Sequence, residues 1–275
     1  MSPQSPAQII GSGLELGFGV YLKLFMATSL IAFLQLLPTM DLALRLGNTE
    51  FTPEYRLEQQ FSLHQCLLQL ATLLLILLVQ GMAIARLDHL AKGLMGDYRD
   101  EWRRALKAFL PLLGAILLSL GIIVAGCLMG AVIGLLIGLV GGLLFGKAGF
   151  ALFFALTLAA VVFYVLIYML FMQYCIVLEA KGPITAVNRS FRLVYGKWWR
   201  SFTVIVLMLL IIVLGGILFG IVLAPAMMAT GGNLTGRGVF IMGVIQMAVG
   251  AVIAPVMLAV FYTLYHDLKL RSPEA

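Results

Sequence analysis

Residues 110–146 read LPLLGAILLSLGIIVAGCLMGAVIGLLIGLVGGLLFG, and none of these 37 side chains is charged. Such a segment can enter hydrocarbon without taking an ionised group out of water, which would be costly. A single α-helix of this length would be about 55 Å long, whereas about 20 residues suffice to cross the ~30 Å hydrocarbon core of a membrane. The stretch therefore predicts a membrane protein and supplies more helix than one span needs.

The composition of the rest of the chain agrees with this prediction. Of its 275 residues, 62% are hydrophobic and 11% are charged, whereas a soluble domain has roughly 25% charged residues. The mean hydropathy is +1.07, and no polar stretch approaches the ~50 residues of a small domain. We therefore expect a single membrane domain over residues 1–275 and no separate soluble catalytic domain.

Hydrophobic stretches of sufficient length recur along the chain. We predict an all-α fold, a polytopic membrane helix bundle with about six transmembrane helices near residues 18–38, 62–86, 108–129, 150–178, 202–224 and 238–265. Charged segments at 39–60, 87–107 and 179–201 and a Gly- and Ala-rich loop at 225–237 separate these spans. For residues 130–146 two alternatives stay open: the third helix protrudes, or a short extra helix or hairpin forms at the outer surface.

The distribution of basic residues predicts the orientation. Six spans place 14 Lys and Arg side chains on one side and only Arg45, Arg56, Lys147 and Arg237 on the other. Basic residues near membrane spans stay in the cytoplasm. A complete seventh span would move the basic residues of 181–200 outside. We therefore expect a multi-pass protein of the bacterial cell inner membrane with both termini in the cytoplasm.

The three even-numbered spans end in similar ways, which predicts an internal repeat. Asp88, Glu179 and Asp267 follow these spans at separations of 91 and 88 residues. The repeat units cover about 5–92, 93–181 and 182–271, each with two spans, so they are parallel and related by a pseudo-threefold axis along the membrane normal. A carboxylate at a helix C-terminus faces the negative end of the helix dipole, so a basic partner is expected. We interpret the three acids as an interfacial charge collar of salt bridges, which we favour over a ring that binds headgroups or a ligand.

Amphipathic stretches precede the odd-numbered spans. Over 184–198 the apolar residues are spaced 3-4-3-4, and residues 97–107 and 10–25 show comparable stripes. Helices of this kind lie in the headgroup layer. Candidate contacts to anionic headgroups at the cytoplasmic face are Arg99, Arg103, Arg104, Lys107, Arg189, Arg192, Lys197 and Arg200. Because the basic residues lie beside hydrophobic spans, we expect membrane lipids and another membrane protein as partners, and no nucleic acid.

Glycines recur every four residues in the uncharged stretch. They are Gly126, Gly130, Gly134 and Gly138, and Gly142 and Gly146 continue the series. A helix with this spacing presents one flat ridge along which another helix can approach closely. We favour helix packing over a pore lining or a hinge.

Two segments resemble a known family. They are Leu178-Glu179-Ala180-Lys181-Gly182-Pro183, continuing to Arg200, and the C-terminal Tyr262–Lys269. Both resemble YciC-like bacterial inner-membrane proteins and the membrane domain attached to some glycerophosphoryl diester phosphodiesterases. The resemblance implies a six-helix inner-membrane bundle with little established chemistry. The phosphodiesterase activity of such proteins belongs to a separate barrel domain, so no catalytic residue is carried over. Relatives have a Pro-Gly turn where this chain has the glycine-rich segment 138–142.

The sequence shows no catalytic motif, cofactor motif or metal-ligand cluster, so we expect neither an enzyme nor a bound cofactor or metal. One interpretation is a membrane module of unknown molecular function that supports envelope or lipid organisation or anchors a partner. The other is a transporter or channel for small molecules or lipids, with a path along the pseudo-threefold axis. The absence of ionisable residues from the middle of the spans argues against a proton-coupled transporter. A polar, water-accessible axis would favour transport, and an axis packed with Leu and Gly would favour the module.

The topology can be tested with reporter fusions after Glu54, Lys147 and Ala275. Because basic residues stay inside, a periplasm-specific reporter should be active at Glu54 and Lys147, and a cytoplasm-specific reporter at Ala275. An internal reading at Glu54 or an external reading at Ala275 would contradict the six-span topology.

Overall fold

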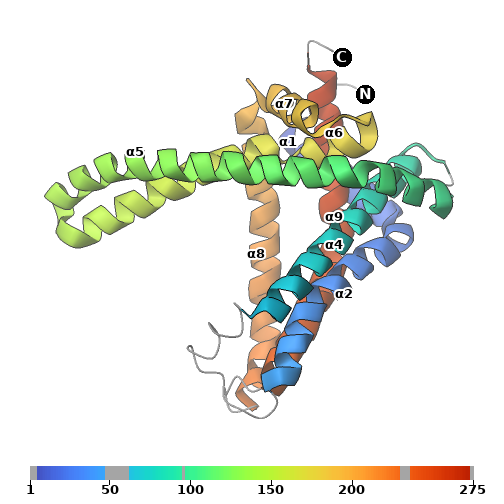
Figure 1. Cartoon of the computed structure of the whole chain (residues 1–275), viewed down its shortest axis with the longest axis horizontal. Coiled ribbons are helices and arrows are strands. Elements are labelled where there is room, and N and C mark those ends of the chain that lie inside the picture. The colour runs from blue at the N-terminus through green and yellow to red at the C-terminus, as the bar shows by residue number, and fades with distance from the viewer. Residues whose placement is uncertain (1–4, 47–61, 95–96, 230–235, 273–275) are drawn as a thin grey trace. The chain divides into compact units, whose positions relative to one another are not determined.

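The computed structural model describes residues 5–46, 62–94, 97–229 and 236–272, and over these residues every regular element is a helix (Figure 1). The helices are α1 (Pro6–Gly19), α2 (Tyr21–Leu46), α4 (Leu63–Ala91), α5 (Tyr98–Met169), α6 (Met172–Glu179), α7 (Pro183–Val194), α8 (Trp198–Ala229) and α9 (Gly236–Leu270). The all-α class is confirmed. Most of the expected outer loop at 39–60, and residues 230–235 of the expected loop at 225–237, lie outside the described residues.

The helices begin at residues that satisfy free backbone N–H groups. Ser5 and Gln8 form a capping box at α1, in which the Ser5 hydroxyl accepts from the Gln8 N–H at 3.2 Å, and Pro6 follows as the first helical residue. The Asp97 carboxylate accepts from the Arg99 N–H at 3.1 Å ahead of α5. Gly182 and Pro183 open α7. These residue types are the ones that start helices, because they supply an acceptor or need no donor of their own.

Four helical segments are long and apolar enough to cross a membrane: Tyr21–Arg45, Leu63–Ala91, Tyr98–Glu179 and Phe240–Leu270. A fifth is obtained if α7 and the start of α8, which meet at a 92° bend, count as one broken span. The chain is therefore a membrane protein with four to five such segments among its described residues. The expected spans at 108–129 and 150–178 both fall in the segment Tyr98–Glu179, so the number six stays a prediction.

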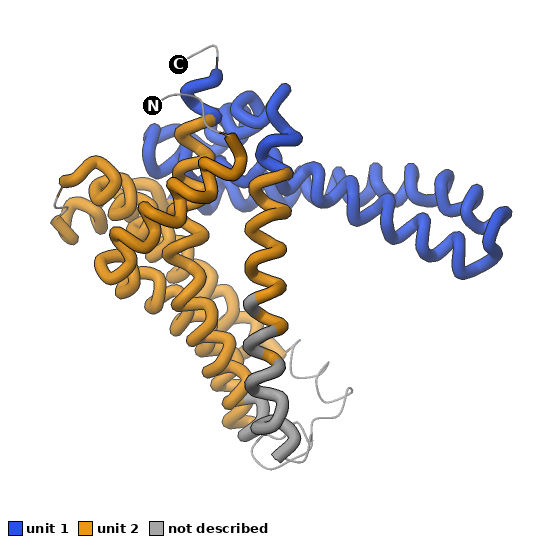
Figure 2. The backbone as a smooth tube through the Cα atoms, turned by 180° about the vertical axis from the view of Figure 1, so that it is seen from behind, with its two compact units in different colours: residues 1, 110–202, 268–275 blue, residues 2–109, 203–267 orange. Residues whose placement is uncertain are grey.

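The chain divides into two compact units (Figure 2): unit 1 comprises residues 1, 110–202 and 268–275, and unit 2 comprises residues 2–109 and 203–267. In unit 2, small residues let α9 approach its neighbours. A Cβ atom on Gly13 of α1 would lie 2.7 Å from the Val260 Cα of α9, and one on Gly243 of α9 would lie 2.7 Å from Leu36 of α2. Backbones thus pack closely here, as small residues permit in membrane helices.

Unit 1 contains a hairpin that α5 forms with itself. The helix reverses at Gly146, whose φ of 69° and ψ of −159° are not helical. The glycine ridge faces the returning arm: a Cβ atom would lie 3.2 Å from Leu158 at Gly130, 3.1 Å from Phe154 at Gly134, and 3.1 Å from the Phe150 ring at Gly138. The ridge is therefore confirmed as a helix-packing surface.

The structure favours the first of the two alternatives for residues 130–146, in which the third helix continues past its expected end at residue 129. The helix does not end near residue 129, and no separate outer helix forms; the first arm is continuous from Tyr98 to the turn at Gly146. Residues 97–107 are likewise the start of this arm rather than a separate surface helix. No charged residue interrupts the apolar stretch, and the second arm packs against its glycines. Gly146 is not part of the packing ridge, because nothing lies within 4 Å of a Cβ atom there. It forms the turn instead, where its positive φ favours glycine.

The hairpin can be tested at the glycine ridge. Replacing Gly134 by Leu should destabilise the protein by about 1–3 kcal/mol, because even a Cβ atom would lie 3.1 Å from the Phe154 ring and the longer side chain must push the arms apart. Gly121→Leu is the matched control, since nothing lies within 4 Å of a Cβ atom there. Thermal unfolding of both variants in detergent, followed by tryptophan fluorescence, measures the effect. Equal melting temperatures for the two variants would contradict the packing role.

Candidate functional site

In unit 1, Glu179 lies at the end of α6 among cationic side chains. The helix ends there because Ala180 takes a left-handed conformation, with φ 51° and ψ 36°, and directs the chain toward α7. A Glu179 carboxylate oxygen lies 3.1 Å from the Lys181 Nζ atom, and the other lies 2.9 Å from the Lys269 Nζ atom. The Arg189 Nε atom is 3.8 Å from the first of these oxygens. These cations compensate the unfavourable position of a carboxylate at a helix C-terminus.

The short helix α7 is fixed by its buried face. Ala186 and Leu193 are fully buried, and the Ser190 hydroxyl donates to the Tyr168 carbonyl of α5 at 2.5 Å. The Phe191 ring stacks on the Tyr168 ring with centroids 5.0 Å apart. Arg189 is 8% exposed and belongs to this buried set, although its sequence position predicted a headgroup contact. The packing holds α7 in one orientation and thereby fixes the direction of its arginines.

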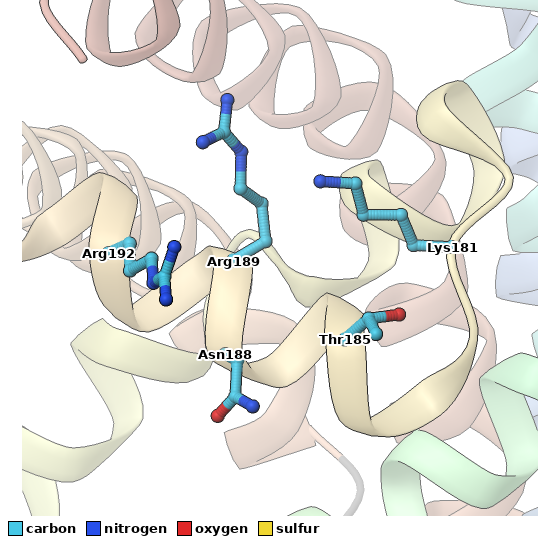
Figure 3. Close-up of a pocket in the computed structure, with 5 residues that line it drawn as sticks. All are labelled: Lys181, Thr185, Asn188, Arg189 and Arg192. Carbon is cyan, nitrogen blue, oxygen red and sulfur yellow. The ribbon is translucent and has the colours of Figure 1, made fainter. Parts of the chain in front are cut away.

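A pocket of about 240 Å³ lies against α7 in unit 1 (Figure 3). It is lined by Lys181, Thr185, Asn188, Arg189 and Arg192, a set that we call the α7 pocket. The Lys181 side chain extends toward Arg189 in Figure 3. Three lining residues are cationic and the other two carry polar groups, so the pocket has the chemistry of an anion site. Arg189 and Arg192 are among the cations predicted to contact headgroups, whereas the sequence pattern indicated no binding role for Asn188, Thr185 or Lys181.

The two remaining candidate cations of unit 1, Lys197 and Arg200, flank the start of α8. The Lys197 ammonium lies 3.4 Å from the Leu268 carbonyl oxygen and donates to it, so it caps the last turn of α9. Arg200 is partly buried, next to an aromatic cluster in which the Trp198 and Phe202 rings stack at 5.0 Å. Trp and Tyr side chains are typical of the membrane–water boundary.

In unit 2, the carboxylate of Asp88 has different partners from that of Glu179. It is 5% exposed, and its carboxylate accepts from the Lys92 ammonium at 2.6 Å and from the Tyr262 hydroxyl at 2.9 Å. The basic partner thus comes from the same helix, one turn further on. Tyr262 and Tyr174 are both buried, although each lies five residues before an acid, a natural height for an aromatic belt at the interface. For Tyr262 the reason is its hydrogen bond to Asp88.

Unit 2 also contains a buried charge cluster that the sequence analysis missed. Glu101, which is 1% exposed, lies 3.3 Å from an Arg86 guanidinium nitrogen and 3.5 Å from the His89 Nδ1 atom. The Arg86 guanidinium also lies 4.0 Å from the centre of the Tyr98 ring. The signal in the sequence was the series Glu101, Ala105 and Ala108, whose spacing of four and three residues marks a buried helix face. The series was overlooked because larger apolar residues lie beside it.

The other face of this part of α5 is exposed. Arg99, Arg103, Arg104 and Lys107 are all exposed, as the prediction of headgroup contacts requires. The expected apolar stripe of Tyr98, Trp102 and Leu106 is exposed too. Aromatic and cationic side chains on one outer surface are typical of a helix that meets the headgroup layer.

The three acids of the expected collar are found in both units. Asp88 and Asp267 belong to unit 2 and are buried, and Glu179 belongs to unit 1. The two units are described separately, so a single ring that contains all three acids stays a prediction. The threefold repeat stays a prediction as well. Among the described residues, no group of three or more His, Cys, Asp or Glu side chains is arranged to hold a metal ion.

One comparison with known proteins gives a match. The family model described as "Domain of unknown function (DUF7847)" matches residues 7–268. No curated protein and no solved structure matches the chain. The resemblance to YciC-like proteins and to the phosphodiesterase membrane domain therefore stays a hypothesis.

The buried cluster can be tested through Glu101. Glu101→Gln should lower the free energy of unfolding by about 3–5 kcal/mol, because it leaves the Arg86 charge buried without its carboxylate. Asp100→Asn, at the exposed neighbouring acid of the same helical turn, should stay within about 0.5 kcal/mol. Denaturant or thermal unfolding in detergent compares the two. A second change, Arg86→Met, should restore part of the loss in the Glu101→Gln protein, and a failure to do so would argue against the ion pair.

Proposed function

The chain belongs to the DUF7847 family, a domain of unknown function, and we propose that it is a non-enzymatic module of the bacterial inner membrane that binds anionic phospholipids at its cytoplasmic face. By holding these lipids it organises the surrounding membrane or anchors a partner membrane protein. The proposal includes six spans and cytoplasmic termini.

The observation that carries the proposal is the 92° bend between α7 and the start of α8. If α8 crosses the membrane, a helix at a right angle to it lies along the membrane surface. α7 has a buried apolar face and carries Asn188 and Arg192 on its exposed side. A helix with this division of residues is suited to the headgroup layer, where cations meet lipid phosphates.

A second observation supports six spans. Gly146 divides α5 into two antiparallel arms, and each arm is longer than the ~20 residues that one crossing requires. The hairpin would then provide two spans and return the chain to the side from which it came. This arrangement keeps Arg99, Arg103 and Arg104 on the same side as the cations of α7, in agreement with the positive-inside rule.

The proposal is tested by extracting the protein with its surrounding lipid into polymer-bounded nanodiscs and analysing lipids and proteins by mass spectrometry. Anionic lipids should be enriched over the bulk membrane, because the cytoplasmic cations attract them at about 1 kcal/mol per basic residue. The double variant Arg103→Gln/Arg104→Gln should reduce this enrichment. The outer pair Lys147→Gln/Arg237→Gln removes the same charge and should not reduce it.

The outcomes separate the candidate functions. Equal lipid composition in the discs and in the bulk membrane, or equal effects of the two double variants, would contradict the proposal. A stoichiometric membrane protein in the same discs would identify the anchored partner. Substrate uptake into proteoliposomes that depends on the protein would favour the transporter instead.

A further inference from the structure

A cluster of aromatic rings forms in unit 1 where α7 meets α8. The Trp198 ring stacks on the Phe202 ring and meets the Trp199 ring edge-on, in each case with ring centres 5.0 Å apart. It also lies 5.3 Å from the Tyr164 ring of α5, whose hydroxyl is hydrogen-bonded to that of Tyr168 at 3.1 Å. Stacked and edge-on rings hold one another in place. With Tyr195, at the end of α7, we call these residues the aromatic corner.

The aromatic corner is only partly covered by the protein. Trp199 is 73% exposed, Tyr195 is 77% exposed and Tyr164 is exposed as well, whereas Tyr168 is buried. Each exposed ring combines an apolar body with one polar N–H or O–H group, so it suits surroundings that are apolar on one side and polar on the other. The ester groups of a lipid bilayer, between the headgroups and the acyl chains, provide such surroundings.

The residues before and after the corner change from charged to apolar. Arg192 and Lys197 lie on either side of Tyr195 in the sequence, and every exposed side chain over residues 206–210 of α8 is apolar. Trp199 precedes this apolar stretch by about 10 Å along the helix. The exposed rings therefore lie between the cations and the apolar part of α8, which is the order of the layers from the headgroups to the hydrocarbon.

We propose that the aromatic corner is an anchor that binds the ester and glycerol layer of the cytoplasmic leaflet through Trp199 and Tyr195. The inference rests on the proposed function in one respect, namely that α8 crosses the membrane from the cytoplasmic side. Its chemistry is different, because ester groups are common to phospholipids of any headgroup charge. The anchor holds the start of α8 at one depth and thereby keeps α7 among the headgroups.

The test uses the three tryptophans of the chain as probes of depth. In the full chain, Trp102→Phe/Trp198→Phe keeps Trp199, and Trp102→Phe/Trp199→Phe keeps Trp198 as the matched control. Both are placed in phosphatidylcholine bilayers whose acyl chains carry bromine close to the ester or close to the terminal methyl. Bromine close to the ester should quench Trp199 fluorescence about twofold more than bromine at the chain end. Trp198 is less exposed and should be quenched less at either depth.

A second measurement avoids any change to Trp198. Trp199→Leu keeps an apolar side chain but loses the indole N–H, and it should lower the melting temperature in phosphatidylcholine nanodiscs by a few degrees. Trp199→Tyr keeps an aromatic ring with a polar edge and should retain most of the stability. The difference between the two variants should be smaller in detergent micelles, which have no layer of ester groups.

The outcomes separate the anchor from the binding of anionic lipids. Trp199 fluorescence that is quenched equally at both depths, or most at the chain end, would overturn the anchor, as would equal melting temperatures for Trp199→Leu and Trp199→Tyr in nanodiscs. Quenching close to the ester that requires phosphatidylglycerol in the bilayer would also overturn it, because headgroup charge would then set the depth. These results leave the enrichment of anionic lipids intact. Loss of that enrichment, with quenching close to the ester retained, would refute the proposed lipid binding and leave the anchor.

Discussion

Hydrocarbon offers a peptide group no hydrogen-bonding partner, so every backbone N–H and C=O within a membrane must be satisfied inside the protein. This constraint explains why the described residues form helices, and the ion pairs of Glu179 and Asp88 lie at helix ends. Glu179 lies at the last residue of α6, and Asp88 lies in the last turn of α4. At these positions the end of a helix exposes carbonyl groups, and each carboxylate adds negative charge to the same place. The cations and hydroxyl groups near these positions compensate the negative charge of the carboxylates and of the helix ends.

The same solvent changes what holds the helices together. Lipid chains are as apolar as leucine, so burying apolar side chains gives little driving force between membrane helices, and close van der Waals contact becomes more important. The α5 hairpin follows this rule. Gly134 and Gly138 bring its arms together against phenylalanine rings, while Leu136 and Leu143 remain exposed on the outer surface. An apolar exterior and a glycine-lined interior are the reverse of what a soluble helical hairpin requires.

The sequence was sufficient where one residue type has one physical meaning. The apolar stretches predicted membrane helices, and the four-residue glycine spacing predicted a packing ridge. Contacts between distant segments could not be predicted. Tyr262 and Asp88 are 174 residues apart, and nothing local to either residue indicates their hydrogen bond. The sequence left the continuity of α5 as one of two alternatives, because a long glycine-rich helix is stable only when a second arm packs against it, which is a tertiary effect.

The two acids at helix ends show how similar sequence positions acquire different electrostatic roles. The Asp88 carboxylate is paired with one ammonium, on Lys92, and accepts a hydrogen bond from the neutral hydroxyl of Tyr262, so one positive charge balances its negative charge. Glu179 instead contacts three cations, on Lys181, Arg189 and Lys269. The cations gathered at Glu179 come from three places: Lys181 from the connection after α6, Arg189 from α7 and Lys269 from the end of α9. The same carboxylate thus joins the ends of two helices and the connection between α6 and α7. Similar positions at two helix ends are therefore stabilised in different ways: Asp88 by groups of its own unit's helices α4 and α9, and Glu179 by cations gathered from three parts of unit 1.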